Sequence, residues 1–347
     1  MMRTTESPAQ TRMFQEAGQA SAVVREQLLA NAEAAARIGA RLRAVQPRLL
    51  LTCARGSSDH AATFARYLVE TRSGVFTASA APSVISVYGT EMDFRGCACL
   101  LISQSGASPD LLAFAAAAKA GGALVIALVN VADSPLAQIA DEVLELRAGP
   151  ETSVAATKSF IASLAASIHL LAAWRQDAEL AAALEQAPQL LREAWDGDWG
   201  AALEPLAGAN SLFVLGRGLG LGVAQEAALK FKEVCGLHAE AYSSAEVLHG
   251  PISIAGEGDP ALFLAQDDAS LPGMAELLDA LVQRGLCCIA AGLSHPGAIV
   301  LPSPKAHPAI EPMLRIQGFY RLVNELSLKL GRDPDRPPFL NKVTATV

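Results

Sequence analysis

Short apolar runs alternate with longer Ala- and Leu-rich stretches along most of the chain. The runs predict strands near residues 48–54, 98–103, 123–129, 142–146, 211–216, 261–265 and 286–291. The longer stretches predict helices over residues 61–70, 109–120, 159–174, 222–235, 271–284 and 310–330. This alternation is typical of open parallel sheets with helices on both faces. Ligands of such sheets bind beyond the carboxyl ends of the strands.

The two halves of the chain repeat the same features at one spacing. Four pairs of identical residues lie 162 positions apart: Arg55 and Arg217, Gly56 and Gly218, Gly96 and Gly258, Gln104 and Gln266. Because predicted strands are in step at the same spacing, we infer an internal duplication of one α/β unit. We therefore expect an N-terminal helical segment over residues 1–45, two α/β domains over 46–190 and 195–330, and a Pro-rich, charged tail over 331–347.

Composition and charge narrow the classes of function. Half of the residues are apolar and aromatic residues are few, which suits helices packed on parallel sheets. The net charge of −8 argues against nucleic acid and membrane surfaces as partners. No apolar stretch reaches the roughly 18 residues that span a bilayer, and the N-terminus lacks the core of a signal peptide.

The cysteines indicate a protein of the reducing cytoplasm. Six of them lie mostly within apolar runs, and no pair of CxxC motifs is present. This pattern indicates neither a zinc site nor a disulfide framework. We expect a cytoplasmic protein that needs no metal or cofactor.

A strand that ends in hydroxyl groups is the clearest candidate for a binding site. Residues 98–110 have the sequence ACLLISQSGASPD, in which Ser103, Gln104, Ser105 and Ser108 stand between a strand and a helix. Free N–H groups at a helix start, together with serine hydroxyls, suit an anion. No Walker lysine or GxGxxG spacing is present, which favours a small phosphorylated metabolite over a nucleotide. The alternative is a serine-rich turn with an N-cap at Ser108 or Asp110.

The corresponding segment of the second half lacks these hydroxyl groups. Ala265 and Asp267 stand where the first half has Ser103 and Ser105, and the Asp267 carboxylate would repel a phosphate. We therefore expect one phosphate site per chain.

Residues 228–251 hold the densest set of titratable groups. Lys230 and Glu233 are three residues apart, so on a helix they share one face, and Glu233 is a candidate base for proton transfer. The alternative is an ordinary ion pair on an exposed helix. His238 and His249 are expected to flank a polar loop, and His249 precedes Gly250-Pro251 in a tight turn that presents its imidazole.

Lys342 lies in the tail segment FLNKVTATV. Terminal residues are commonly disordered, and a lone terminal lysine then has no role. The apolar residues on both sides of Lys342 predict instead that this tail docks on the body of the protein. A docked lysine can reach a carbonyl group and form an imine.

Seven motifs in order resemble the sugar-isomerase (SIS) family, and within it the isomerase half of glutamine–fructose-6-phosphate aminotransferase. They are ARGSS at 54–58, SQSGAS at 103–108, ETSVAATKSF at 151–160, ALKFKE at 228–233, HAEAY at 238–242, HGP at 249–251 and NKVT at 341–344. The resemblance extends over nearly the whole chain from about residue 25. It implies two tandem SIS subdomains, each an open parallel sheet flanked by helices.

The resemblance also implies a role for each matching position. Ser103, Gln104, Ser105 and Ser108 would hold a sugar 6-phosphate, and Ser58 and Val154 would line the sugar site. Glu233 matches the base that moves a proton between C1 and C2, with Lys230 as its neighbour. His249 matches a ring-opening histidine supplied by a second subunit, so a homodimer with shared active sites is expected. Lys342 matches a tail lysine that forms a Schiff base with the open-chain sugar.

One departure from the aminotransferase directs the functional expectation. The full aminotransferase has a glutaminase domain whose nucleophile is a cysteine directly after the initiator methionine, whereas this sequence begins Met1-Met2-Arg3. We expect a glucosamine-6-phosphate deaminase that yields fructose 6-phosphate and ammonia. The alternatives are a deglycase or isomerase acting on galactosamine 6-phosphate or fructosamine 6-phosphate, and a non-catalytic sugar-phosphate sensor.

Overall fold

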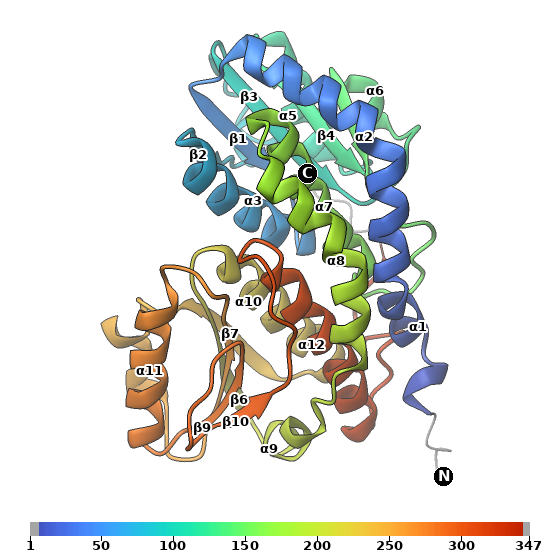
Figure 1. The fold of residues 1–347 in the computed structure, drawn as a ribbon. Helices are drawn as coiled ribbons and strands as arrows, with labels where there is room; N and C mark the ends of the chain where they lie inside the picture. Colours follow the sequence, from blue (N-terminus) through green and yellow to red (C-terminus); the bar gives the residue numbers. More distant parts are fainter. Residues whose placement is uncertain (1–6, 343–347) are drawn as a thin grey trace. The chain divides into compact units, whose positions relative to one another are not determined.

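The computed structural model describes residues 7–342. Within these residues the chain divides into two compact units. Unit 1 comprises residues 7–21, 151–158 and 187–342, and unit 2 comprises residues 22–150 and 159–186. Each unit contains one five-stranded sheet with helices packed on it (Figure 1). The predicted α/β class, with two helix-flanked parallel sheets, an N-terminal helical segment and a C-terminal tail, is confirmed; residues 1–6 and 343–347 of the predicted ends lie outside the described residues.

The sheet of unit 2 has the strand order β2-β1-β3-β4-β5, with every neighbouring pair parallel. Its strands are β1 (Leu49–Cys53), β2 (Phe76–Ser79), β3 (Cys97–Ser103), β4 (Leu124–Val129) and β5 (Glu142–Glu145). The central strands β3 and β4 are buried almost throughout, because helices cover both faces of the sheet.

Successive side chains along these strands point to opposite faces, and each face has its own set of helices. The helices are α2 (Ala20–Val45), α3 (Ser57–Ser73), α4 (Ser83–Ser86), α5 (Pro109–Ala120), α6 (Pro135–Ile139) and α7 (Lys158–Arg175). Phe114 of α5 and Leu136 of α6 pack with Leu101 on one face. Leu68 of α3 and Leu170 of α7 line the other face with Leu100.

The sheet of unit 1 has the order β10-β9-β8-β6-β7, again all parallel. Its strands are β6 (Ser211–Gly216), β7 (His238–Ser243), β8 (Pro260–Leu264), β9 (Cys287–Ala291) and β10 (Ile299–Leu301). Its longer helices are α10 (Leu219–Lys230), α11 (Leu271–Gln283) and α12 (Glu311–Lys329), and its shorter ones are α1 (Arg12–Gly18) and α9 (Leu203–Ala207). Helix α8 (Ala178–Asp196) carries the chain toward this sheet.

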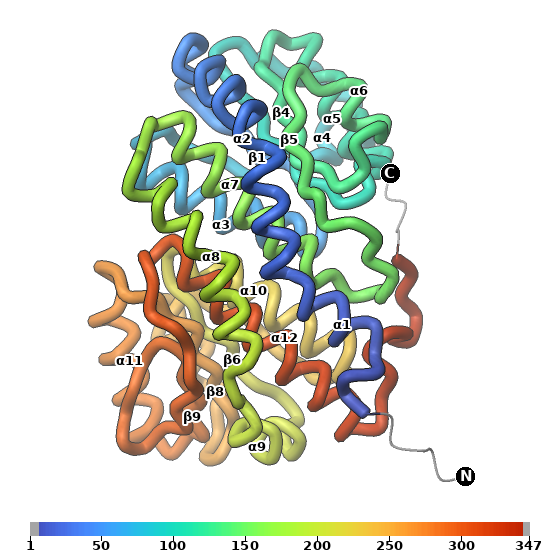
Figure 2. Tube along the Cα trace, turned by 45° about the vertical axis from the view of Figure 1, so that its right-hand side comes forward, coloured from blue at the N-terminus to red at the C-terminus, as the bar shows by residue number. Residues whose placement is uncertain are grey.

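Helices α10 and α12 of unit 1 lie side by side (Figure 1, Figure 2). The rings of Phe231 and Phe319 meet edge to face, with centroids 5.0 Å apart. Helix α11 packs its apolar side chains, among them Leu277 and Leu281, against Phe263 of β8. The core of unit 1 therefore lies on both faces of the sheet, as in unit 2.

The two sheets are the same structure built twice. Read from β7, the second order is β7-β6-β8-β9-β10, which matches β2-β1-β3-β4-β5 strand for strand. Gly56 and Gly218 precede equivalent helices with φ of 55° and 56°, and Gly74 and Gly236 end them in the left-handed conformation. A residue with a Cβ atom rarely adopts such positive φ angles, so glycine stands at each position. The predicted duplication is confirmed.

The structure adds elements that the apolar pattern did not predict. Strands β2, β7 and β10 lie at sheet edges, where one side is solvated and a continuous apolar run is not needed. As a result, residues 238–243 form a strand, so the expectation that His238 borders a loop is wrong. The predicted helix over 222–235 also differs: α10 gives way to a π-helical turn over Phe231–Cys235.

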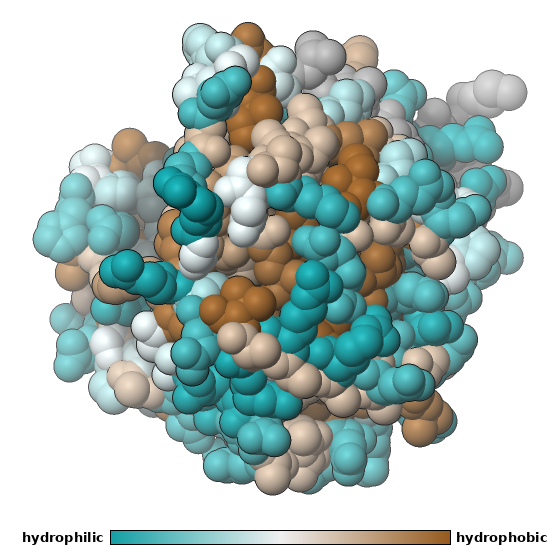
Figure 3. All heavy atoms as spheres, turned by 90° about the horizontal axis from the view of Figure 1, so that it is seen from above, coloured by the Kyte–Doolittle hydropathy of each residue, from teal (hydrophilic) through white to brown (hydrophobic). Residues whose placement is uncertain are grey.

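Among residues 7–342, no helix combines the length and apolarity that crossing a bilayer requires. Hydrophobic and hydrophilic residues are interspersed on the face shown in Figure 3. In unit 2 the large apolar residues that remain exposed include Phe76, Val87 and Tyr88. They lie on the edge strand β2 and directly after α4.

Candidate functional site

In unit 2, the loop between β3 and α5 is folded around its serines. The Gly106 N–H donates a hydrogen bond to Ser103 Oγ at 3.1 Å, and the Ala107 N–H donates one to Ser105 Oγ at 3.4 Å. Gly106 has a φ of 62°, and a Cβ atom there would collide with the Ser134 side chain. Ser108 occupies the N-cap position of α5, but its side chain makes no capping hydrogen bond. The N-cap alternative therefore does not account for the Ser108 hydroxyl group.

A second loop of unit 2 lies beside this one, because β1 and β3 are paired parallel neighbours. Ser58 belongs to the first turn of α3, directly after β1. Arg55, in the same loop, forms an ion pair with the fully buried Asp110 of α5 at 2.7 Å. The ion pair joins the segments that follow β1 and β3. Unit 2 therefore brings Ser58 and residues 103–108 together at the carboxyl ends of its strands.

At the carboxyl ends of the strands in unit 1, a carboxylate of the protein itself bonds the equivalent loop. Glu311 of α12 is buried, and its Oε2 accepts a hydrogen bond from the Asp267 N–H at 2.7 Å. Asp267 is the counterpart of Ser105, so in unit 1 the N–H group at this position already bonds a side-chain carboxylate. Arg315 balances the Glu311 charge at 3.3 Å. The expected asymmetry between the halves therefore has a structural basis.

In unit 1, Lys230 lies between two carboxylates. Its Nζ is 2.5 Å from Glu233 Oε2 and 3.3 Å from Glu226 Oε1, and both Lys230 and Glu226 are fully buried. Burial alone would lower the pKa of Lys230, but the negative charges of Glu226 and Glu233 outweigh it and raise that pKa. Lys230 is therefore an ammonium ion inside the protein, and the alternative of an ion pair on an exposed helix is wrong.

Tyr320 of α12 completes this cluster. Its hydroxyl group donates a hydrogen bond to Glu226 Oε1 at 3.2 Å. Burial raises the pKa of Tyr320 well above its ordinary value, and the negative charges of Glu226, Glu151 and Glu233 raise it further. These three carboxylates therefore lie within electrostatic range of one buried phenol.

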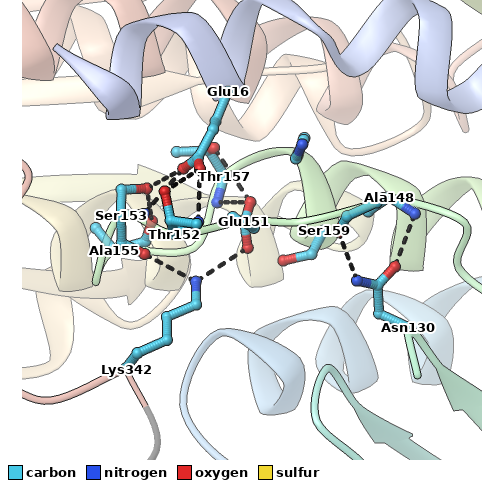
Figure 4. Close-up of polar contacts among 12 residues, drawn as sticks. Glu16, Asn130, Ala148, Glu151, Thr152, Ser153, Ala155, Thr157, Ser159 and Lys342 are labelled. Atoms are coloured by element: carbon cyan, nitrogen blue, oxygen red, sulfur yellow. Dashed lines mark hydrogen bonds and ion pairs between the residues drawn. The ribbon is translucent and has the colours of Figure 1, made fainter.

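Lys342 contacts the body of unit 1, as expected (Figure 4). The apolar residues from which docking was predicted do not make this contact: Phe339 and Leu340 are exposed, and residues 343–347 lie outside the described residues. Its Nζ donates a hydrogen bond to the Ser153 carbonyl oxygen at 2.8 Å and lies 3.3 Å from Glu151 Oε2. The Glu151 side chain is fully buried, and its Oε1 accepts a hydrogen bond from the Thr157 N–H at 3.0 Å. Lys342 and Glu151 thus form a second lysine–carboxylate pair, and both pairs lie near Tyr320.

The segment that holds Lys342 is itself held by Glu16 of α1 (Figure 4). The Thr152 and Ser153 N–H groups and hydroxyl groups all donate hydrogen bonds to the two Glu16 carboxylate oxygens. Burial raises the pKa of Glu16, but these hydrogen bonds, led by that of Ser153, outweigh it, and the net shift lowers the pKa. The ionised Glu16 therefore fixes the backbone around Val154.

The remaining predicted catalytic residue, His249, lies in the segment that follows β7. It ends a short 3₁₀ turn over Val247–His249, is exposed, and precedes Gly250 with a φ of 141°. Among the described residues, no hydrogen bond or ion pair joins it to Lys230, Glu233 or Lys342. Within residues 7–342 there is also no group of three or more His, Cys, Asp or Glu residues arranged to hold a metal ion.

Sequence reasoning missed four residues of the site: Glu16, Glu151, Glu226 and Tyr320. One of them had a visible signal, because Glu226, Lys230 and Glu233 share a helix face at i, i+4 and i+7 spacing. Glu16 and Tyr320 reach the site from elements far away in the sequence. Spacing along the chain could not have identified them.

We predict that Glu16→Gln destabilises the protein in a pH-dependent way. The Glu16 pKa is below its ordinary value of 4.5 in the folded state, so its carboxylate stabilises the fold above that pH. We expect a loss of about 1.5–3 kcal/mol at neutral pH, the scale of hydrogen bonds to a charged group. The loss should shrink as the pH falls through the lowered pKa.

The measurement is urea unfolding of wild type and variant across this pH range. Glu26→Gln, which removes an exposed carboxylate on α2, is the control and should change stability by less than about 0.5 kcal/mol. An equal loss from Glu16→Gln at neutral and acidic pH would contradict the assigned role of the charge.

Comparison with known proteins was made against family models, curated sequences and solved structures. The SIS domain model matches residues 45–173 and 205–290. Glutamine–fructose-6-phosphate aminotransferase (isomerizing) of Aeropyrum pernix is 35% identical over 317 residues, which cover 86% of this chain and 51% of that protein. The chain thus spans about half the length of the curated relatives it matches.

Two solved structures show the same architecture. A protein of Silicibacter pomeroyi DSS-3, assigned to the phosphosugar isomerases, has a TM-score of 0.90 at 43% identity, covering 94% of this chain and all of that one. Glucosamine-6-phosphate deaminase of Thermotoga maritima has a TM-score of 0.77 at 20% identity, covering 97% of this chain and all of that one, and shares the fold. Because the family model matches more than half of the chain, this protein belongs to the SIS domain family, as its motifs indicated.

Proposed function

We propose that this protein is a phosphosugar isomerase that converts glucosamine 6-phosphate and water into fructose 6-phosphate and ammonia. The observation that carries the proposal is the presence of two lysine–carboxylate pairs, Lys230–Glu233 and Lys342–Glu151, near the buried Tyr320. Proton transfer between carbon atoms needs a carboxylate base, and engagement of an open-chain carbonyl group suits a lysine. The relatives in the aminotransferase family support a sugar phosphate as substrate.

The proposed reaction divides among these groups. The loop over residues 103–108 binds the phosphate through N–H and hydroxyl groups, with Ser58 and Val154 beside the sugar. His249 opens the pyranose ring, and Lys342 engages the C1 carbonyl group. Glu233 takes the proton from C2 and returns it to C1. In the same step the C1 oxygen gains a proton and the C2 amine loses one, so C1 becomes a hydroxymethyl group and the C2 amine becomes a ketimine. Water adds to this ketimine, and ammonia leaves.

The charged cluster of unit 1 favours an enzyme over a non-catalytic sensor of sugar phosphates. A sensor needs a phosphate loop, but it has no use for a fully buried lysine between two carboxylates. Burial of such charges costs free energy, so it calls for a chemical reason.

We also propose that two copies of the chain share their active sites. His249 is exposed, and it is joined to neither lysine–carboxylate pair by a hydrogen bond or ion pair among the described residues. A ring-opening histidine supplied by a second copy would serve a site that already contains Lys230, Glu233 and Lys342. Two-fold dimers are the commonest arrangement for such sharing.

The first prediction is ammonia release from glucosamine 6-phosphate by the purified protein, with no glutamine and no added metal. Fructose 6-phosphate should form in equal amount.

Glu233→Gln should keep substrate binding and lose at least about 100-fold in turnover, the usual scale for a general base. Lys232→Gln, on the same π-helical turn, is the matched control and should keep turnover. Normal turnover by Glu233→Gln would remove Glu233 from the mechanism, and no turnover of any amino sugar phosphate by the wild type would overturn the proposal.

The second prediction uses the duplication to test the phosphate loop. Ser105→Asp copies the residue found in the second half, and we expect it to weaken sugar-phosphate binding by at least about tenfold, or 1.4 kcal/mol, through charge repulsion. Asp267→Ser is the reciprocal control and should leave binding unchanged, because Glu311 already occupies that edge. Calorimetric titration measures both. Unchanged binding by Ser105→Asp would place the phosphate elsewhere.

The third prediction tests Lys342 and the shared site together. His249→Ala and Lys342→Ala should each be inactive alone. When the two are co-refolded, half of the dimers combine one copy of each, and one of their two sites contains both intact residues. About a quarter of the wild-type activity per chain should return. A mixture that stays inactive would show that both residues come from one copy.

A further inference from the structure

Comparison of the two duplicated units identifies two buried positions that are apolar in unit 2 and charged in unit 1. Counting 162 residues from α3 to α10, the positions of Phe64 and Leu68 become those of Glu226 and Lys230. Phe64 and Leu68 are fully buried apolar residues of unit 2, and Glu226 and Lys230 are equally buried in unit 1. Equivalent buried positions of the two units therefore hold apolar side chains in one unit and a pair of opposite charges in the other.

The local backbone changes together with these residues. Helix α3 is α-helical from Ser57 to Ser73, whereas α10 ends at Lys230 and a π-helical turn follows over Phe231–Cys235. π-helical turns are frequent at functional sites. Here the turn contains Glu233, whose Oε2 meets the Lys230 ammonium group at 2.5 Å and whose side chain is 19% exposed.

Glu233 is thus the member of the cluster that reaches solvent, and Glu226 is the buried member. The groups around Lys230 are Glu226 of α10, Glu233 of the π-helical turn and Tyr320 of α12, with Glu151 of the 151–158 segment also near Tyr320. The two carboxylates compete for a single ammonium ion. If Glu226 carried no charge, the Lys230 ammonium would attract only Glu233, and the Glu233 carboxylate would become a weaker base.

We propose that Glu226 is a positioning residue that shares the Lys230 ammonium with Glu233 and so keeps Glu233 basic enough to accept a proton from a sugar carbon. The proposal rests on the proposed function for the role of Glu233. Its own content, the sharing of one ammonium ion, concerns the protein without substrate. Tyr320 supports the arrangement by donating its hydroxyl proton to Glu226.

The test is the titration of Glu233 in substrate-free protein, followed by ¹³C NMR of glutamate labelled at the carboxyl carbon. The Glu233 signal is assigned by its loss in Glu233→Gln. In Glu226→Gln, which keeps the shape of the side chain and an acceptor for Tyr320, the Glu233 signal should titrate about one pH unit lower than in wild type. An unchanged or higher midpoint would overturn the proposal.

Three further measurements make the result specific. Glu226→Asp keeps the charge but draws it away from Lys230, so it should give a smaller shift in the same direction, and it serves if Glu226→Gln does not fold. Glu185→Gln removes an exposed carboxylate on α8 and should cause no shift. In turnover assays, the acid limb of the kcat profile should move down with the NMR midpoint while KM stays constant.

These readouts separate the two proposals. A shifted NMR midpoint in a protein that turns over no sugar phosphate would leave the shared ammonium established and remove the proposed function. Turnover of glucosamine 6-phosphate with an unshifted midpoint and an unshifted acid limb would support the proposed function and overturn the shared ammonium.

Discussion

The direction of the strands is the constraint on which each unit depends. Because all five strands of a sheet are parallel, the loops that follow them gather at one edge, and helices begin there with unpaired N–H groups. This edge attracts negative charge wherever it occurs. In unit 2 it is lined by serine hydroxyl groups, whereas in unit 1 the Glu311 carboxylate occupies it from within. The same scaffold thus carries serine hydroxyl groups at this place in one unit and a carboxylate in the other.

The two duplicated units differ in the side chains at two equivalent core positions. At two core positions of α3, unit 2 keeps Phe64 and Leu68, whose burial stabilises the fold by roughly 1.5–3 kcal/mol each. Unit 1 has Glu226 and Lys230 there, and such a buried pair is often no more stabilising than apolar residues. Removing one member alone costs about 3–5 kcal/mol, because it leaves the other charge unpaired. Exchanging both members for apolar residues is therefore expected to cost less stability than removing one of them.

The lysine of the tail depends on a chain of contacts that starts at the other end of the sequence. Glu16 accepts hydrogen bonds from Thr152 and Ser153, and the fixed segment presents the Ser153 carbonyl oxygen to Lys342. The two N–H groups that precede this carbonyl group, those of Thr152 and Ser153, are both bonded to Glu16. A carboxylate on helix α1 thereby helps to position the amine of Lys342, the last residue that the structure describes.

The sequence by itself determined the α/β class, the duplication and the serine loop, because apolar periodicity and local motifs depend on neighbouring residues. It also identified Lys230 and Glu233 as a pair, since i,i+3 residues share a helix face. The i,i+4 spacing of Glu226 and Lys230 offered a further signal, but the sequence could not determine that the pair is buried, that Tyr320 contacts Glu226, or that Glu16 and Glu151 hold Lys342. Those facts depend on contacts between residues 94 to 191 positions apart in the chain, which only the tertiary structure decides.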